Sequence, residues 1–225
     1  MNPTGLFVAL GGAILLWVFF VSRLRAKPWI DKGPIELQDG ASGVPAERVG
    51  LWIFLAVVTS LFSLFIVMYS ERATYPDWRS LPAPQLLWIN TIFLVLGSVA
   101  FQLARGAAKR ENLAGVKTSL TAGGVFTIVF LVGQVLAWQQ LSAAGFFLVT
   151  NPADAFFYLT TGLHGLHLLG GLWVWARTTS RVWHGLESFN VKQIAAVRLS
   201  VQLCSVYWHY LLLVWLVLFY FLSTS

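Results

Sequence analysis

Six long apolar stretches, with no Asp, Glu, Lys or Arg in their interiors, follow one another along the chain. Each is close to the roughly 17–25 residues that an α-helix needs to cross a bilayer. Helices are favoured because backbone amides in hydrocarbon must bond within their own segment, and the alternating ten-residue pattern of β-barrels is missing. The sequence predicts an all-α, polytopic membrane helical bundle. The six predicted transmembrane helices are Leu6–Ser22, Val49–Ser70, Leu86–Ala104, Leu120–Leu141, Ala155–Ala176 and Leu199–Leu222.

The connections between these stretches are short, except for the segment after the first. Residues 23–48 carry three clusters of Pro or Gly and look like an irregular tether. We therefore divide the chain into an N-terminal transmembrane helix with a cytoplasmic tether (1–48) and a five-helix bundle (49–225). We find no internal repeat, no Gly-rich phosphate loop and no paired carboxylates suited to acid–base chemistry.

The basic residues predict an orientation. Only Arg72 and Arg79 lie on one side of the predicted bundle, together with both termini. Cytoplasmic loops of membrane proteins are enriched in Lys and Arg, so both termini are predicted to lie outside. The thirteen basic residues of the other side are Arg23, Arg25, Lys27, Lys32, Arg48, Arg105, Lys109, Arg110, Lys117, Arg177, Arg181, Lys192 and Arg198.

Composition supports the membrane assignment. Of the 225 residues, 57% are hydrophobic and 11% are charged, whereas soluble domains average about 25% charged residues. The net charge of +6 follows membrane topology rather than forming a nucleic-acid surface, so no nucleic acid partner is expected. The single cysteine, Cys204, excludes a disulfide framework.

Polar residues inside the stretches are neutral and gather on faces. Ion-coupled transporters and proton pumps usually keep an ionisable residue in the membrane, so an autonomous pump is disfavoured. At 100° per residue, each of the last three helices carries one polar or small face, which is typical of helices that associate in membranes. The predicted polar interhelical or lipid-facing residues are Asn90, Gln134, Thr160, His164, His167, Gln202 and His209.

The histidines could bind a metal or haem, but hydrogen-bonded packing between helices is the favoured interpretation. His164 and His167 share one helix face and cannot both be axial ligands of one iron. Pairing either with His209 is possible, yet a zinc site would need further ligands. Handling of protons or of lipid headgroups is a further alternative. We predict no catalytic, cofactor-binding or metal-ligating residue in this chain, and neutral histidines.

Two segments resemble a known family. The segment "FFYLTTGLHGLHLLGG" (156–171) resembles the Gly-x-His-x-x-His segment in subunit III of the haem–copper (cytochrome c or quinol) oxidases. The segment "VYWHYLLLVW" (206–215) is similar to the Tyr-Trp-His-Phe element of that family's last helix. Three weaker matches, "GLWIFLA", "LPAPQLLWINT" and "GQVLAW", stand in the same order, and together the five cover residues 49–225.

The resemblance implies a role. Subunit III is a helical bundle that carries no haem or copper, packs against the catalytic subunit and holds phospholipids between its helices. We therefore expect a non-catalytic accessory subunit of a proton-pumping respiratory complex in the bacterial inner membrane. Its expected partners are subunits I and II, with haem and copper in the partner, and bound phospholipid.

The sequence also departs from the family pattern. Where the family usually has carboxylates within its helices, this chain has Val58, Ala137, Gln202 and Leu212. Any part that those acids play in proton transfer is not expected here. The chain has one predicted helix beyond the five-helix core, whereas the longer family form has two.

Two other functions remain open at this point. A subunit III-like accessory protein of a nitric oxide reductase would also tolerate an interior that is poor in acids. A free-standing membrane cytochrome would instead show stoichiometric haem in the isolated chain.

Overall fold

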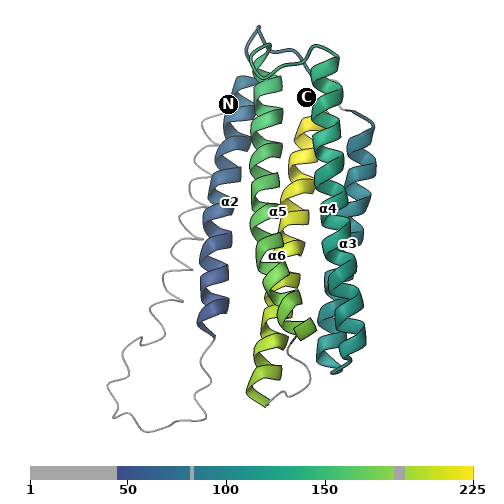
Figure 1. Cartoon of the computed structure of the whole chain (residues 1–225). Coiled ribbons are helices and arrows are strands. Elements are labelled where there is room, and N and C mark those ends of the chain that lie inside the picture. The colour runs from purple at the N-terminus through teal and green to yellow at the C-terminus, as the bar shows by residue number, and fades with distance from the viewer. Residues whose placement is uncertain (1–44, 82–83, 185–190, 225) are drawn as a thin grey trace, which may run out of the picture. The chain divides into compact units, whose positions relative to one another are not determined.

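The described part of the protein consists entirely of α-helices and their connections. A computed structural model describes residues 45–81, 84–184 and 191–224. The all-α prediction is confirmed for these residues, while the predicted helix Leu6–Ser22 and nearly all of segment 1–48 lie outside them. The five helices, shown in Figure 1, are α2 (Ala46–Arg72), α3 (Leu86–Lys109), α4 (Leu113–Ala143), α5 (Pro152–His184) and α6 (Val191–Thr224).

Helix α6 has neighbours in three of the other described helices. Helix α6 contacts α2, α3 and α5, while α4 packs between α3 and α5. Among the described helices, α2 has its backbone neighbours in α5 and α6 and none in α3 or α4. Figure 1 accordingly shows α2 on one side of α5 and α6, with α3 and α4 on the other.

Two tight turns set the path between helices in the centre of the chain. The Asn112 side chain caps α4 by accepting a hydrogen bond from the Gly115 amide at 3.0 Å, which satisfies one of the free donors at a helix start. After α4 the chain turns at Gly145, whose φ of +90° favours glycine. The Tyr158 hydroxyl donates to the Phe146 carbonyl at 2.9 Å and ties this turn to α5. These short connections make α3, α4 and α5 neighbours.

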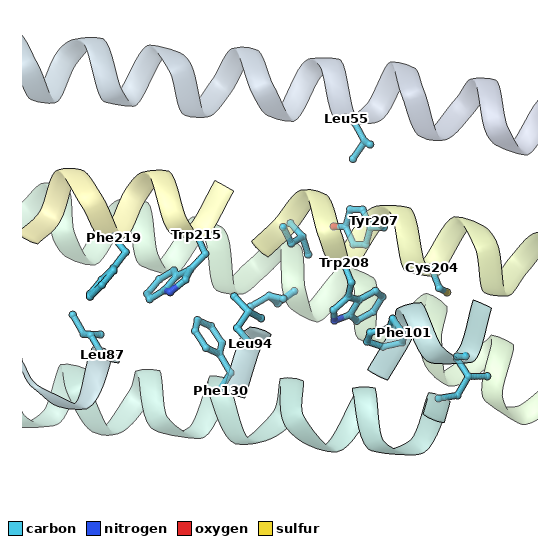
Figure 2. Packing of buried hydrophobic residues seen from close by; sticks show 14 of the residues in the cluster. Leu55, Leu87, Leu94, Phe101, Phe130, Cys204, Tyr207, Trp208, Trp215 and Phe219 are labelled. Carbon is cyan, nitrogen blue, oxygen red and sulfur yellow. The ribbon is translucent and has the colours of Figure 1, made fainter. Parts of the chain in front are cut away.

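Two tryptophans of α6 fill the centre of the bundle (Figure 2). Trp208 and Trp215 are fully buried. The Trp208 ring lies 4.2 Å from the Phe101 ring of α3, and the Trp215 ring lies 4.9 Å, edge to face, from the Phe130 ring of α4 (centroid distances). Such aromatic pairs add about 0.5–1.5 kcal/mol to their area burial. The core therefore lies where α3, α4 and α6 meet.

Glycines on α4 let large side chains of its neighbours reach the α4 backbone. A Cβ at Gly124 would lie 2.1 Å from the Trp175 ring, and a Cβ at Gly133 would lie 1.9 Å from Asn90 Oδ1. The Trp175 indole also donates to the Leu120 carbonyl at 2.8 Å, which fixes its ring over α4. Small residues that allow close approach are a common basis of helix packing in membranes.

Helices α2, α3, α4 and residues Ile194–Ser223 of α6 are long and apolar enough to cross a membrane. Helix α5 is equally long but more polar, with Asp154, His164 and His167 among its residues, and does not reach the same apolarity. Large apolar side chains are exposed around the bundle, as a lipid-facing surface requires. The protein is thus a multi-pass membrane protein, and the count of six spans remains a prediction.

Candidate functional site

His164 lies at the centre of an aromatic cage formed by three other helices. Its side chain is fully buried, and its ring centroid lies 5.3 Å from Trp215 of α6, 6.0 Å from Phe130 of α4 and 6.4 Å from Phe62 of α2. Neither ring nitrogen has a hydrogen-bond partner among the described residues. The sequence favoured hydrogen-bonded packing for this residue; the structure shows the packing without the hydrogen bond.

His167 lies one turn further along α5 in a different setting. It is half-buried, and its Nδ1 is 2.7 Å from the Leu163 carbonyl of its own helix. Its ring lies 5.5 Å from the ring of Phe62, and its backbone carbonyl accepts a 2.8 Å hydrogen bond from the Tyr207 hydroxyl of α6. The two histidines therefore share a helix face, as predicted, but not an environment.

His209 belongs to a polar seam between α3 and α6. Its Nδ1 contacts the Ser98 hydroxyl, and its Nε2 lies 3.1 Å from the Gln102 side-chain oxygen. The Ser205 hydroxyl donates to the same oxygen at 3.2 Å. This seam was only half predicted, because Ser98 and Gln102 on α3 had not been connected with the stripe on α6.

The four remaining predicted residues are scattered through the bundle. The Thr160 hydroxyl donates to the Phe156 carbonyl of its own helix at 2.7 Å. Asn90 packs on Gly133 of α4, and its amide nitrogen, like both polar atoms of the buried Gln134 side chain, has no partner among the described residues. The Arg48 guanidinium of α2 donates to the Gln202 oxygen at 3.4 Å. The predicted residues are therefore spread through the bundle rather than gathered in one site, and only some of them contact another helix.

Hydrogen bonds from tryptophan to threonine join the helices at three levels of the core. Trp208 donates to Thr127 of α4, and Trp215 donates to Thr91 of α3, each at 2.9 Å. A third bond of this kind links Trp138 to Thr161 at 3.1 Å. Sequence reasoning missed Trp208 and Trp215; their position in mid-helix, away from the headgroup level, was the available signal.

A cavity of about 500 Å³ lies between α2, α5 and α6. Its wall is mostly apolar, with Leu51 and Phe54 from α2, Gly170 from α5 and Leu203 from α6. Glu47, in the first turn of α2, lies at its edge as a charged group. An apolar cavity with one charged residue at the end of a helix suits an amphipathic chain such as a lipid.

The described side chains do not converge on a metal. No three His, Cys, Asp or Glu side chains come together as ligands within the described ranges. Cys204 is buried, and its sulfur lies 3.8 Å from the Thr178 hydroxyl. Several of the polar groups contact a neighbouring helix, and together with the apolar helices they define the protein as a multi-pass membrane bundle.

Comparison with known proteins narrows this class to one family. The family described as cytochrome c oxidase subunit III matches residues 48–224, which include all but the first two residues of α2 and extend to the end of α6. The chain belongs to this family. The resemblance inferred from the His164–His167 and His209 segments is thereby confirmed.

Several relatives from bacteria are similar over most of their length. The chain is 28% identical to cytochrome c oxidase subunit 3 of Synechocystis sp. over 186 residues, which are 80% of this chain and 76% of the relative. It is 28% identical to cytochrome c oxidase subunit 3 of Thermostichus vulcanus, covering 84% and 95% of the two chains. It is 26% identical to cytochrome bo(3) ubiquinol oxidase subunit 3 of Pseudomonas putida, covering 76% and 82%.

Proposed function

We propose that this chain is the non-catalytic accessory subunit, subunit III, of a haem–copper terminal oxidase in the bacterial inner membrane. It packs on catalytic subunit I and on subunit II, and the haem and copper of the complex belong to these partners. The family match over residues 48–224 carries the proposal. The bacterial relatives, which are subunits of cytochrome c and ubiquinol oxidases by name, support it.

The chemistry of the bundle agrees with a structural role. The sequence places no carboxylate in the middle of its apolar stretches, and Val58 and Ala137 are buried apolar residues where the family usually has acids. Apolar side chains at these positions neither gain nor lose a proton, so they cannot take the part of those acids in proton transfer. The subunit therefore contributes assembly, durability and lipid binding to the complex.

Purification by a tag on this chain tests the proposal directly. The co-purified complex is expected to contain haem and copper in the larger subunits and to consume oxygen. Haem-containing complex that reduces nitric oxide and lacks copper would instead assign the chain to a nitric oxide reductase. A Soret band from the isolated chain would assign it as a cytochrome.

The effect on turnover is tested in proteoliposomes with and without this chain. Removing it is expected to shorten the working life of the oxidase while leaving the initial proton-to-electron ratio unchanged. A ratio that falls from the first turnovers, and that a His164→Gln variant reproduces, would contradict a purely structural role.

The proposed topology has six spans, with both termini outside and the basic loops in the cytoplasm. It predicts that Asp154 lies outside and Ala108 inside. Asp154 itself is buried, so single cysteines replace the exposed Val149, just before α5, and the exposed Lys109 beside Ala108, in a Cys204→Ala background. They are labelled in intact cells with a reagent that does not cross the membrane. Labelling at position 149 alone is expected, and labelling at position 109 would overturn the arrangement.

The cavity between α2, α5 and α6 is proposed to hold a phospholipid acyl chain. A Cβ at Gly170 would meet no atom within 4 Å, so a Gly170→Leu side chain has room to extend into the cavity. Lipid retained by the purified complex, measured by mass spectrometry, is expected to fall in this variant. Gly50→Leu is the matched control, because Gly50 is equally open but does not line the cavity.

A further inference from the structure

The polar seam between α3 and α6 reaches the outer surface of the described bundle. Gln102 is exposed and His209 is half-buried, although both lie within helices apolar and long enough to span the membrane. Behind them, Ser98 and Ser205 are buried. An exposed amide in a transmembrane helix is costly in lipid, because hydrocarbon offers no hydrogen-bond partner.

The hydrogen bonds of the seam leave a donor facing outward. The Gln102 side-chain oxygen is near both the Ser205 hydroxyl and His209 Nε2, at 3.2 and 3.1 Å. Its NH₂ group makes no hydrogen bond with any residue that the structure describes. The acceptor of this side chain is therefore used inside the bundle, and its donors are free on the surface.

Arg105 adds a cation to the same edge. It follows Gln102 by three residues on α3, so the two side chains are neighbours on the helix surface. Arg105 is half-buried, its Nε is buried without a hydrogen-bond partner, and no carboxylate within the described ranges pairs with it. The edge thus presents an amide donor and a guanidinium that both lack acceptors among the described residues.

The rest of this edge is apolar and accessible. Val99 lies one turn before Gln102, and Leu213 lies one turn after His209; both are exposed. The outer face of α4 differs, because its exposed positions Val125 and Val132 have apolar neighbours such as Ile128, and the exposed Thr121 hydroxyl donates to the Lys117 carbonyl of its own helix. Lipid can cover that face without leaving a polar group unsatisfied.

We propose that the α3–α6 edge, formed by Val99, Gln102, Arg105, His209 and Leu213, docks a transmembrane helix of the catalytic subunit. The partner helix presents hydrogen-bond acceptors, a carboxylate or free carbonyls, opposite Gln102 and Arg105. Complementary charge and hydrogen bonding give such a contact its specificity. The identity of the partner rests on the proposed function, whereas the choice of face rests on the surface itself.

Photo-crosslinking in the intact complex tests the face. A benzoylphenylalanine residue replaces Val99 or Leu213 on the edge, or Val125 or Val132 on α4 as controls. Both edge positions are expected to give a product with the haem-containing subunit, and the α4 positions are not. Products from α4 alone, or only lipid adducts from the edge, would overturn the docking face while the complex itself still purifies. If no haem protein purifies with the chain, the proposed function fails instead.

Dissociation of the complex gives a second measure. Arg105→Leu removes the cation without touching the hydrogen bonds of His209, so folding of the bundle is preserved. Arg105 lies near the predicted cytoplasmic end of α3, and loss of its polar contact with the partner is expected to speed dissociation from the oxidase in detergent about three- to tenfold, the range for polar contacts between membrane helices. Leu103→Ala, an exposed neighbour on α3, is the control and should dissociate at the original rate. An unchanged rate for Arg105→Leu would contradict an acceptor opposite this side chain.

Discussion

Helix α4 and helix α2 are both apolar and long, yet they are attached to the bundle in different ways. In the most apolar window of α4, 44% of residues are buried, against 17% in α2. Glycines bring neighbouring side chains onto the α4 backbone, whereas α2 touches only α5 and α6 among the described helices. Hydrophobicity places a helix in the membrane, but close packing decides how firmly it is held.

A larger side chain at Gly124 is expected to disturb the packing of α4 the most. A Gly124→Ala methyl group would collide with the Trp175 ring, which its hydrogen bond to Leu120 holds in place. Overpacking of this kind is expected to lower the free energy of unfolding by about 3 kcal/mol. Thermal unfolding in detergent measures the effect. Gly50→Ala on α2, where a Cβ meets nothing within 4 Å, should cost nothing; an equal loss at both sites would remove the contrast.

The aromatic cage of His164 is the next test, because it joins α2 to the core through Phe62. His164→Ala leaves a cavity among Phe62, Phe130 and Trp215, and the expected loss is about 2 kcal/mol. Unfolding and the optical spectrum of the purified complex are measured together. The haem spectrum should stay unchanged, and a shift on this substitution would revive the interpretation of His164 as a ligand.

A smaller effect is expected where α2 meets α6 through Tyr210. The Tyr210 hydroxyl donates to the Leu55 carbonyl at 3.3 Å and lies 2.8 Å from the Thr59 hydroxyl. Tyr210→Phe removes both contacts and is expected to lower the free energy of unfolding by about 0.6 kcal/mol. Hydrogen exchange should become faster in α2 and stay unchanged in α4. Ser200→Ala, whose hydroxyl bonds only its own helix at Ala196, should alter neither helix; faster exchange in α4 would show that the two regions are one unit.

The smallest expected effect lies in the loop after α2. The Arg72 guanidinium contacts both oxygens of the Asp77 carboxylate, and its Nη1 donates to Oδ1 at 2.7 Å. This contact holds the pKa of the Asp77 carboxyl below its ordinary value. A carboxyl whose pKa is lower in the folded state stabilises the fold at pH values above its unfolded-state pKa of about 3.9. This stabilisation is lost as the pH falls through the lowered folded-state pKa. Because the pair is exposed, the contribution is small. NMR titration of Asp77 should show its pKa rising in Arg72→Gln, and an unchanged titration would contradict the pairing.

The sequence predicted the five described helices well but their lengths less well. The predicted stretch Leu120–Leu141 lies within α4, which begins at Leu113, and Ala155–Ala176 lies within α5, which ends at His184. Hydrophobicity detects the part of a helix that meets hydrocarbon. It does not detect the polar turns beyond that part. In α4 these turns begin at Leu113, where the Asn112 side chain caps the helix, and in α5 they run through basic residues to His184.

Contacts between helices could be predicted only in part. The polar residues of α6 were predicted to share one helix face, yet they contact different helices: Gln202 contacts Arg48 of α2, while His209 contacts Ser98 of α3. A stripe gives the direction of a side chain and not the helix that lies there, because that depends on how α2 and α3 flank α6. The partners of Trp208 and Trp215 were missed for the same reason.

Arg198 near the start of α6 has a consequence for biosynthesis. Its guanidinium donates to the carbonyls of Ala108 and Lys109 at the end of α3, at 3.3 and 2.7 Å. Helix α6 also supplies the two tryptophans of the core, and it is synthesised after α2, α3, α4 and α5. A nascent chain that stops before α6 has inserted its apolar helices but has neither a finished α3 terminus nor a filled centre. Closure of the bundle therefore waits for the synthesis of α6.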